Sequence, residues 1–247
     1  MAYILNFLIM STILELKKLS KSFGAIEVAN QLDLSLEQGQ AFGIIGPNGA
    51  GKTSVFNLIN GSVKPDSGEI IFNGKIINNL KINERSHLGI SRSFQIPKPF
   101  GTMSVFENVL VAAFYSANEK KELAYSLCLN ILKQTNLLDK ANVITNSLSL
   151  LERKRLELAR SLCAKPKLLL LDEIAGGLSE QECLSLVETI KDIRKTGISI
   201  IWIEHIVKSL LSVVDHLIVM NFGKKIAEGK PHEIIQGKEV QSIYMGI

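Results

Sequence analysis

The first residues that could do chemistry form the segment Gly46-Pro47-Asn48-Gly49-Ala50-Gly51-Lys52-Thr53, which fits the pattern G-x-x-x-x-G-K-[ST]. An apolar run at 41–45 precedes it and predicts a strand, and residues 54–59 predict a helix. Glycines let a backbone curve closely around phosphate oxygens, so that N–H groups and the helix N-terminus point at negative charge. We therefore expect a nucleoside triphosphate here, with Lys52 near the β- and γ-phosphates and the Thr53 hydroxyl on Mg²⁺. The predicted nucleotide-binding set is Gly46, Pro47, Asn48, Gly49, Ala50, Gly51, Lys52, Thr53 and Ser54.

Two carboxylates, Asp172 and Glu173, end the apolar run at 168–171. Such a run predicts a strand buried on both faces of a parallel sheet, and the C-terminal ends of parallel strands face the ligand crevice. We therefore expect Asp172 in the Mg²⁺ shell and Glu173 beside the attacking water. His205 follows the next apolar run, at 198–203, so it is predicted to lie at the same edge and to donate to the phosphoryl oxygens.

Gln95 follows Ser93-Phe94 and precedes Ile96-Pro97-Lys98-Pro99, whose prolines predict a stiff loop. We expect Gln95 to close a strand just before this loop. Its side chain could then ligate Mg²⁺ or orient the attacking water, and transmit that state to the helical segment that follows.

Three kinds of element must position these residues. Residues 12–74 predict short strands between Gly, Asn and Asp turns, and hence an antiparallel β-subdomain. Residues 105–160 repeat apolar residues at spacings of three and four, which predicts helices. Residues 168–203 indicate a βαβ unit with its helix at 180–195. The expected fold is α/β: a phosphate-loop NTPase core with an antiparallel β-subdomain and a helical insertion at about 100–162.

The composition limits the class of protein. The 247 residues are 46% hydrophobic and 21% charged, which suits one globular unit with a subdomain. A net charge of +4 without a long Lys/Arg block argues against nucleic acid as a partner and is compatible with work near an anionic membrane. Cys128, Cys163 and Cys183 lack metal-ligand or disulfide-framework spacing, so we expect buried thiols in a reducing cytosol.

Residues 1–11 are an apolar extension, too short to span a bilayer and without the basic flank and cleavage site of a signal peptide. Strand-like alternation opens at Thr12, so we expect the domain at 12–247 and the natural start at Met10. The intact mass of the protein made from its own gene tests this, because a species that begins at Met1 or Ala2 contradicts it. With no other run of spanning length, the chain is expected to be soluble or peripheral.

In this order, the motifs resemble the nucleotide-binding subunit of ABC transporters from Thr12 onward. Segment 46–53, the Gln95 loop, the strand ending at Asp172-Glu173 and His205 look like that family's Walker A, Q-loop, Walker B and H-loop. Phe23, in Lys21-Ser22-Phe23-Gly24, matches the aromatic residue that stacks on adenine. The resemblance implies ATP and Mg²⁺ as cofactors. It implies Glu173, His205, Lys52 and Gln95 as catalytic residues, and Thr53, Gln95 and Asp172 as metal ligands.

Closer similarity is to the ATPase of branched-chain amino-acid importers, through residues 44–53, 91–95, 102–112 and 203–205. This implies a peripheral ATPase on the cytoplasmic face of the inner membrane that powers amino-acid import through separate permease subunits, with a solute-binding protein in the assembly. Two ATPase subunits would close around ATP, and hydrolysis would reset them. Lipopolysaccharide-export ATPases are similar enough to remain an alternative.

One motif departs from the family. Its signature Leu-Ser-Gly-Gly-Gln is replaced by Leu148-Ser149-Leu150-Leu151-Glu152, with a helix expected at 153–164. In the family this motif contacts the γ-phosphate held by the opposite subunit, and glycine allows the close approach. Leu150 and Leu151 are therefore expected to weaken the site that serves the partner's ATP. This favours a heterodimer over a homodimer, with this chain's Glu173 in the hydrolysing site.

Two further alternatives stay open. A non-transport ABC ATPase would couple the same site to nucleic acid or the ribosome. A basic extension, a coiled-coil insertion or a second nucleotide-binding domain would favour that reading, and none is visible. A regulatory subunit that hardly hydrolyses ATP would follow from Leu150 and Leu151.

Overall fold

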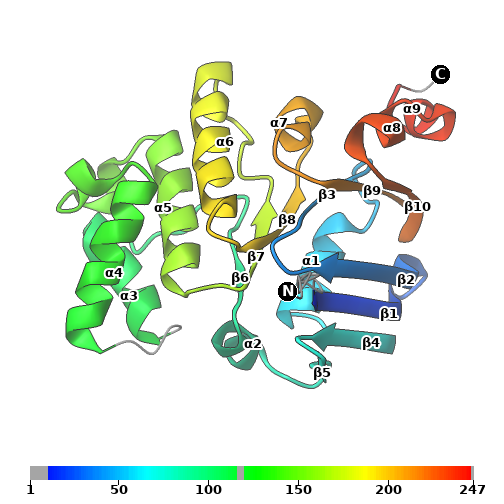
Figure 1. The fold of residues 1–247 in the computed structure, drawn as a ribbon, viewed down its shortest axis with the longest axis horizontal. Helices are drawn as coiled ribbons and strands as arrows, with labels where there is room; N and C mark the ends of the chain where they lie inside the picture. The colour runs from blue at the N-terminus through cyan, green and yellow to red at the C-terminus, as the bar shows by residue number, and fades with distance from the viewer. Residues whose placement is uncertain (1–10, 116–119, 246–247) are drawn as a thin grey trace, which may run out of the picture.

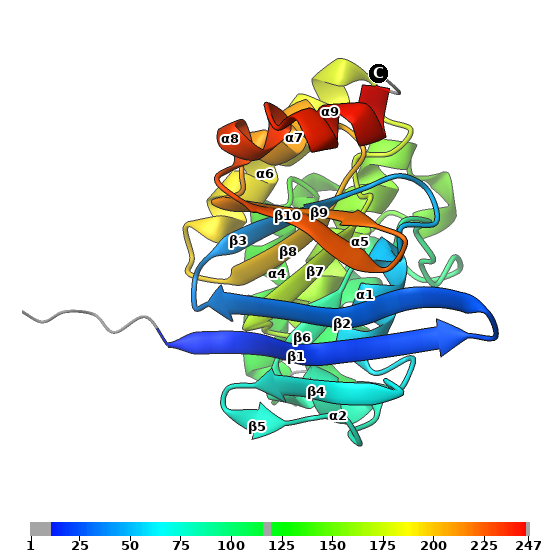
Figure 2. The same ribbon diagram turned by 90° about the vertical axis from the view of Figure 1, so that its right-hand side faces the viewer.

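The structure is a computed structural model that describes residues 11–115 and 120–245. Two β-sheets lie one above the other, with helices over one of them and a group of helices at one end (Figures 1 and 2). The expected start at Met10 lies outside the described residues, as do residues 1–10 of the apolar extension. None of the described helices is long and apolar enough to cross a membrane.

The first sheet is antiparallel, in the order β2-β1-β4-β5. Its strands are β1 (Thr12–Phe23), β2 (Ile26–Glu37), β4 (Ser67–Phe72) and β5 (Lys75–Ile76). The antiparallel β-subdomain is confirmed, but β1 and β2 have 12 residues each, so the expectation of short strands is wrong for them. Polar residues interrupt the alternation in both strands, but they do not end them. The pairing of β1 with β2 continues through irregularities of register, where φ is 46° at Lys18 and 44° at Gln31.

The second sheet has the order β10-β9-β3-β8-β7-β6, and its neighbouring strands are parallel except for β10 with β9. Its strands are β3 (Ala41–Ile45), β6 (Ile90–Arg92), β7 (Leu168–Asp172), β8 (Ser199–Ile203), β9 (His216–Asn221) and β10 (Lys224–Gly229). Every residue of β3, β7 and β8 is buried, as expected for parallel strands covered on both faces. β7, helix α6 (Glu180–Arg194) and β8 form the expected βαβ unit.

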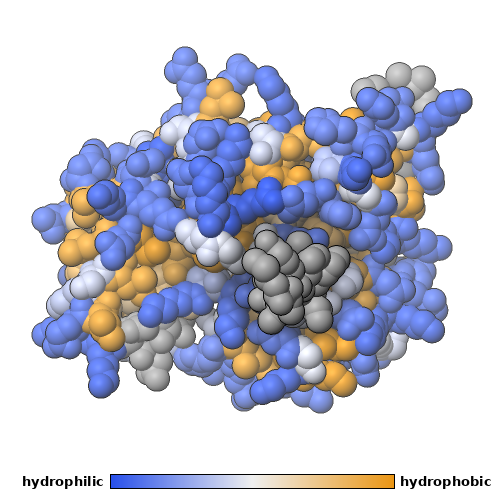
Figure 3. Space-filling model, viewed as in Figure 1, coloured by the Kyte–Doolittle hydropathy of each residue, from blue (hydrophilic) through white to orange (hydrophobic). Residues whose placement is uncertain are grey.

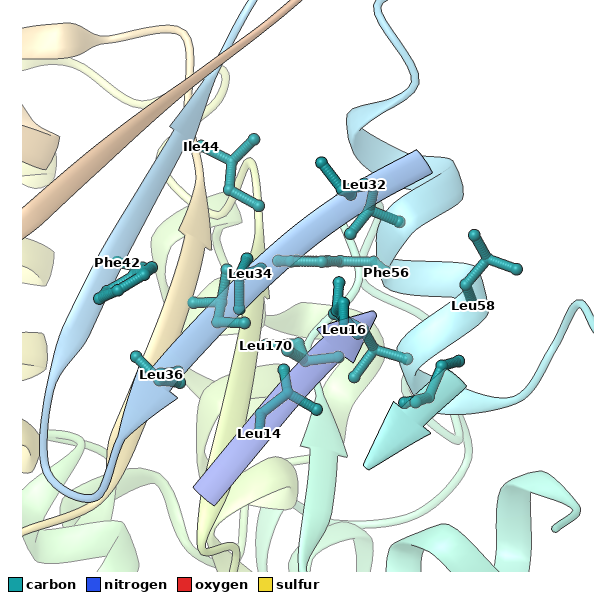
Figure 4. Close-up of a cluster of buried hydrophobic side chains, with 14 of the residues drawn as sticks. Leu14, Leu16, Leu32, Leu34, Leu36, Phe42, Ile44, Phe56, Leu58 and Leu170 are labelled. Atoms are coloured by element: carbon teal, nitrogen blue, oxygen red, sulfur yellow. The ribbon is translucent and has the colours of Figure 1, made fainter. Parts of the chain in front are cut away.

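Helix α1 (Lys52–Asn60) lies between the two sheets, and its apolar side chains fill the space between them (Figure 4). Phe56 and Leu58 of α1 belong to one buried cluster with Leu14 and Leu16 of β1 and Leu170 of β7. Burying each such side chain stabilises the fold by roughly 1.5–3 kcal/mol. The helix that follows the 46–53 loop is thereby fixed against both sheets.

The opposite face of the second sheet is covered by helices from the C-terminal half of the chain (Figure 2). Besides α6 these are α7 (Val207–Leu211), α8 (Pro231–Ile235) and α9 (Lys238–Met245). Leu186 of α6, Leu210 of α7 and Val240 of α9 form a second buried cluster with Trp202 of β8. The central strands β3, β7 and β8 are therefore buried on both faces, which leaves their ends to carry polar groups.

The helical part at one end of the molecule contains α3 (Val105–Tyr115), α4 (Lys121–Gln134) and α5 (Leu150–Cys163), with 3₁₀ turns at Leu138–Lys140 and Thr145–Ser147 (Figure 1, green). A short helix, α2 (Ile82–Leu88), precedes β6. All three cysteines are free and buried, as predicted, and Cys128 and Cys163 lie in the core of this helical part. Its exposed apolar side chains include Tyr115, Leu123 and Leu129, and Figure 3 shows hydrophobic residues gathered over these helices.

Candidate active site

Segment 46–53 forms a loop between β3 and the first turn of α1, as its pattern predicts. Two of its glycines are required because the loop closely approaches the protein's own backbone. A Cβ atom at Gly46 would lie 2.2 Å from the Met220 carbonyl oxygen, and one at Gly51, where φ is +98°, would lie 2.2 Å from the Val28 carbonyl oxygen. The loop is thus held by β2 and β9, with the N-terminus of α1 at its end, a geometry that suits an anion.

The Lys52 ammonium is buried against this loop. It donates to the carbonyl oxygens of Gly46 at 2.7 Å and Pro47 at 3.1 Å. Burial lowers the pKa of Lys52 below its usual value, and the carboxylates of Glu173 and Asp172 partly oppose that shift. Lys52 is therefore held on the loop by two backbone carbonyls and feels the charge of both predicted carboxylates.

The other predicted nucleotide contacts are residues of the loop itself, Ser54 directly after it, and Phe23. Asn48, Gly49 and Thr53 are exposed, Pro47 and Ser54 are half-buried, and Ala50 is buried. Phe23 ends β1 with 51% of its surface exposed, and the Lys21 ammonium lies 5.4 Å from its ring centre. The exposed part of the Phe23 ring is available to stack on a flat ligand, the role that the resemblance implies.

Glu173, which directly follows β7, is the point where the strand-end residues meet. One carboxylate oxygen accepts a hydrogen bond from Gln95 Nε2 at 2.5 Å, and the other lies 2.9 Å from His205 Nε2. The expectation that Gln95 closes a strand is wrong, because the pairing of β6 with β7 ends at Arg92. Gln95 lies in the following loop, and this loop brings its carboxamide to Glu173.

Asp172, the last residue of β7, is held by Arg92, the last residue of β6. The guanidinium lies 2.6 Å from Asp172 Oδ2, and the two side chains are 8% and 6% exposed. A second guanidinium nitrogen donates to Asn57 Oδ1 of α1 at 2.6 Å. Arg92 therefore joins β6, β7 and α1, and it fixes the direction of the Asp172 carboxylate.

Lys154 of α5 also reaches this site, and it was not predicted. Its ammonium donates to the backbone carbonyl oxygens of Gln95 at 2.6 Å and Glu173 at 3.3 Å. A signal for it exists in the sequence, because Lys154 falls at helical spacing between Leu151 and Leu158 and so shares their apolar face.

Glu204 and Arg92 were not predicted either. The buried Glu204 carboxylate accepts from the Ala175 N–H at 2.8 Å and from the His205 N–H at 3.0 Å, and burial raises its pKa. Glu204 precedes the predicted His205, and Arg92 lies three residues before the predicted Gln95. The sequence does not show, however, whether a single charged side chain near a strand end turns inward.

The altered signature forms the start of α5. The helix begins at Leu150, earlier than expected, because Ser149 caps it: the Ser149 hydroxyl accepts from the Glu152 N–H at 3.3 Å, and the Glu152 carboxylate accepts from the Ser149 N–H at 2.8 Å. Leu150 is 44% exposed, and a Cβ at Gly177, in the loop after β7, would lie 3.3 Å from its Cδ2 atom. Leu151 is half-buried against the second core cluster.

The structure thus combines a loop whose geometry suits an anion and a buried ammonium on that loop with a carboxylate that contacts a carboxamide and an imidazole. A carboxylate in such a position can accept a proton from water. The ammonium and the N-terminus of a helix can stabilise charge on a phosphoryl group. This arrangement suits transfer of a phosphoryl group from a nucleotide to water.

Comparison with known proteins agrees with this chemistry. The ABC transporter family matches residues 29–176. The high-affinity branched-chain amino acid transport ATP-binding protein BraF of Pseudomonas aeruginosa is 33% identical over 251 residues, which cover 95% of this chain and 98% of BraF. The lipopolysaccharide export system ATP-binding protein LptB of Acidithiobacillus ferridurans is 31% identical over 244 residues, which cover 96% of this chain and 98% of LptB.

A similar solved structure is the ADP conformation of an ATP-binding cassette of an ABC transporter. It is 30% identical, superposes with a TM-score of 0.87, and is matched over 96% of this chain and 100% of its own length. The likeness therefore includes both sheets and the helical part. The chain binds and hydrolyses ATP, and it belongs to the ABC transporter family as an ATP-binding cassette.

Proposed function

We propose that the chain is the ATP-hydrolysing subunit of an importer for amino acids of the branched-chain class, with the solute path formed by separate membrane subunits. The observation that carries the assignment of the hydrolytic centre is the contact of the Glu173 carboxylate with both Gln95 and His205. The solute class is supported by BraF, which by its name serves branched-chain amino acid transport and resembles this chain over nearly its full length.

In the proposed reaction, Glu173 accepts a proton from the attacking water, and Gln95 orients that water. The His205 side chain is 42% exposed, so one side of its ring is open to the transferring phosphoryl group. The Lys52 ammonium, now on the loop carbonyls, turns to the β- and γ-phosphates when they bind. Phe23 stacks on the adenine ring.

We propose Thr53, Gln95 and Asp172 as the residues that hold Mg²⁺ together with ATP. All three offer oxygen atoms, and Mg²⁺ usually completes its shell with water and substrate phosphates. Among the described residues there is no group of three or more His, Cys, Asp or Glu side chains placed to hold a metal. The donor set fits a metal that arrives with the nucleotide, where it would neutralise charge on the phosphates.

A groove between the helical part and the second sheet is the proposed docking place for the membrane subunits. It has a volume of about 460 Å³, and Phe94, Tyr115 and Arg160 are among its lining residues. Phe94 and Tyr115 are 52% and 77% exposed. Because Phe94 directly precedes Gln95, a subunit seated in this groove would touch the loop that contacts Glu173. The state of the nucleotide could reach the membrane subunits by this route.

We further propose that the chain acts in a heterodimer. The exposed Leu150 side chain lies at the N-terminus of α5, where glycine would let a phosphate approach the helix. It obstructs the site that this chain would build for its partner, whereas a second ATPase with an intact signature would complete the Glu173 site. The assembly would lie on the cytoplasmic face of the inner membrane, with a solute-binding protein delivering the amino acid.

Lipopolysaccharide export is the second candidate, favoured by the 31% identity to LptB over 96% of this chain. The two candidates differ in the molecule that stimulates hydrolysis. A test is to reconstitute the chain in proteoliposomes with candidate permease subunits and a candidate second ATPase from the same genome, and to measure both ATP hydrolysis and uptake of radiolabelled leucine.

Stimulation by the leucine-loaded binding protein, with ATP-driven uptake, is the expected result. Stimulation by lipopolysaccharide alone supports export, and a response to nucleic acid or ribosomes alone contradicts transport. Lys52→Ala should abolish uptake, because it removes the ammonium of the 46–53 loop. Lys208→Ala, at an 89% exposed side chain on α7, is the matched control and should leave uptake intact.

A further inference from the structure

Lys154 is a buried charged residue that the proposed reaction does not use. It is 2% exposed and belongs to α5, the helix whose first turn carries the altered signature. Its ammonium donates to the carbonyl oxygens of Gln95 and Glu173, at 2.6 and 3.3 Å. Both acceptors are backbone atoms of residues whose side chains meet in the active site.

Burying the Lys154 ammonium costs free energy, and favourable interactions with its surroundings must offset that cost. Burial lowers the pKa of Lys154, and the carboxylates of Glu204, Glu173, Asp172 and Glu157 oppose the shift. A leucine or methionine would fill the same space without the desolvation penalty. The positive charge of Lys154 is therefore better explained by its hydrogen bonds to the backbone of Gln95 and Glu173 than by packing.

The Lys154 ammonium holds an unusual piece of backbone. Glu173 has a φ of +45°, in the left-handed region that residues other than glycine adopt at a cost. Its carbonyl oxygen accepts from the Lys154 ammonium and from the Gly176 N–H, at 3.2 Å for the latter. This backbone conformation decides where the carboxylate points, and the carboxylate meets Gln95 and His205.

Helix α5 packs against both the helical part and the second sheet. Leu156 and Cys163 pack in the core of the helical part, whereas Leu158 and Leu162 pack against the parallel sheet. The helix is therefore packed on both sides, and Lys154 lies near its N-terminus, just after the altered signature.

We propose that Lys154 is a positioning residue that fixes the backbone of Glu173 and Gln95, and that through it the signature end of α5 is joined to the hydrolytic centre of its own chain. The proposal rests on the proposed hydrolytic role of Glu173. In a dimer it would make the site serving the partner's ATP and the chain's own site respond to each other.

The test compares Lys154→Met, which keeps the length and removes the charge, with Lys154→Arg, which keeps donors. Arg155→Met is the matched control, since the neighbouring guanidinium donates to Ser185 of α6, away from the site. The first readout is amide hydrogen exchange of the chain alone. We expect residues 93–96 and 173–176 to exchange roughly ten-fold faster in Lys154→Met, and the control to match the native protein.

The second readout is hydrolysis in the full assembly. Lys154→Met should lower kcat roughly 10- to 100-fold with KM for ATP nearly unchanged, because the carboxylate is misplaced while nucleotide contacts remain. Lys154→Arg should restore part of the rate. If Lys154→Met does not unfold cooperatively, the same measurements are made on Lys154→Gln.

Unchanged exchange at both segments overturns the proposal, and so does an unchanged kcat in an assembly where Glu173→Gln abolishes turnover; either result leaves Lys154 as a structural residue. Glu173→Gln in the same assembly separates the two hypotheses. If that variant keeps full turnover, the hydrolytic role of Glu173 is wrong, whereas the exchange data still decide whether Lys154 fixes the backbone.

Discussion

The ion pair between Arg92 and Asp172 permits a quantitative test of how Asp172, a proposed Mg²⁺ ligand, is held. Its charged atoms are 2.6 Å apart and both side chains are buried. The guanidinium also donates to Asn57 and lies 5.6 and 5.3 Å from the ring centres of Phe56 and Phe94. Arg92→Met keeps most of the side-chain length but removes the charge and the donors, so the Asp172 carboxylate is left buried without its partner.

Removing one partner of a buried ion pair costs about 3–5 kcal/mol, because the remaining charge is neither hydrated nor paired. The total stability of a domain is about 5–15 kcal/mol, so this is a large fraction of it. For a chain of this size the loss corresponds to a fall of roughly 6–20 °C in Tm. Replacing both residues, as in Arg92→Met/Asp172→Leu, should cost less than the sum of the single changes, because no unpaired charge remains.

Urea unfolding followed by circular dichroism gives the four free energies of this double-mutant cycle. Lys195→Met is the control, since the ion pair of Lys195 with Asp192 is exposed and its loss should leave the unfolding midpoint unchanged. A loss below about 1 kcal/mol in Arg92→Met, or simple additivity in the double variant, would refute the reasoning that a dehydrated pair holds Asp172.

Three further outcomes are expected. Phe23→Ala should weaken binding of a fluorescent ATP analogue to the isolated chain, whereas Phe23→Trp should preserve it, because adenine stacks on a flat aromatic ring. Equal affinities in both variants speak against stacking. Because burial raises the folded-state pKa of Glu204, the folded protein holds that proton more tightly than the unfolded chain. Stability should therefore fall as pH rises from the unfolded value of about 4.3 through the raised value. The stability of Glu204→Gln relative to the native chain should increase over the same window in unfolding measurements at successive pH values, and a constant difference contradicts this. Leu150→Gly/Leu151→Gly should raise ATP turnover of the proposed heterodimer, because the leucines obstruct the signature. Turnover that is already high and does not change shows that the leucines are tolerated.

Much of the site could be predicted because a parallel sheet constrains it. Residues that end neighbouring parallel strands must lie at one edge, so Glu173 and His205 were expected together, and the structure places them 2.9 Å apart. The loop at 46–53 could be predicted because its glycines and lysine stand at fixed spacing between a strand and a helix.

The groups that hold these residues were harder to predict, since they depend on the direction of single side chains. Arg92, Lys154 and Glu204 are charged residues that ordinary hydropathy places at the surface, yet all three turn inward and bind backbone or carboxylate atoms. Of the three, only Lys154 could have been predicted to be buried, because it falls at helical spacing with the leucines around it.

Two element boundaries also differ from those that the sequence predicts, the start of α5 and the ends of the first strands. The Ser149 and Glu152 capping box starts α5 before the expected position, although the leucines between them look like a break in the motif. In the first sheet, polar residues interrupt the alternation without ending the strands, because pairing with the neighbouring strand outweighs the local pattern at Lys18 and Gln31.

The most direct test of the central claim is ATP turnover of the chain assembled with the proposed permease and second ATPase, with Glu173 native or changed to Gln. The account predicts that Glu173→Gln still binds ATP but loses turnover by roughly 100-fold or more, because the proton acceptor held by Gln95 and His205 is gone. Turnover that stays at the native level in Glu173→Gln would show that hydrolysis takes place elsewhere and would contradict the account.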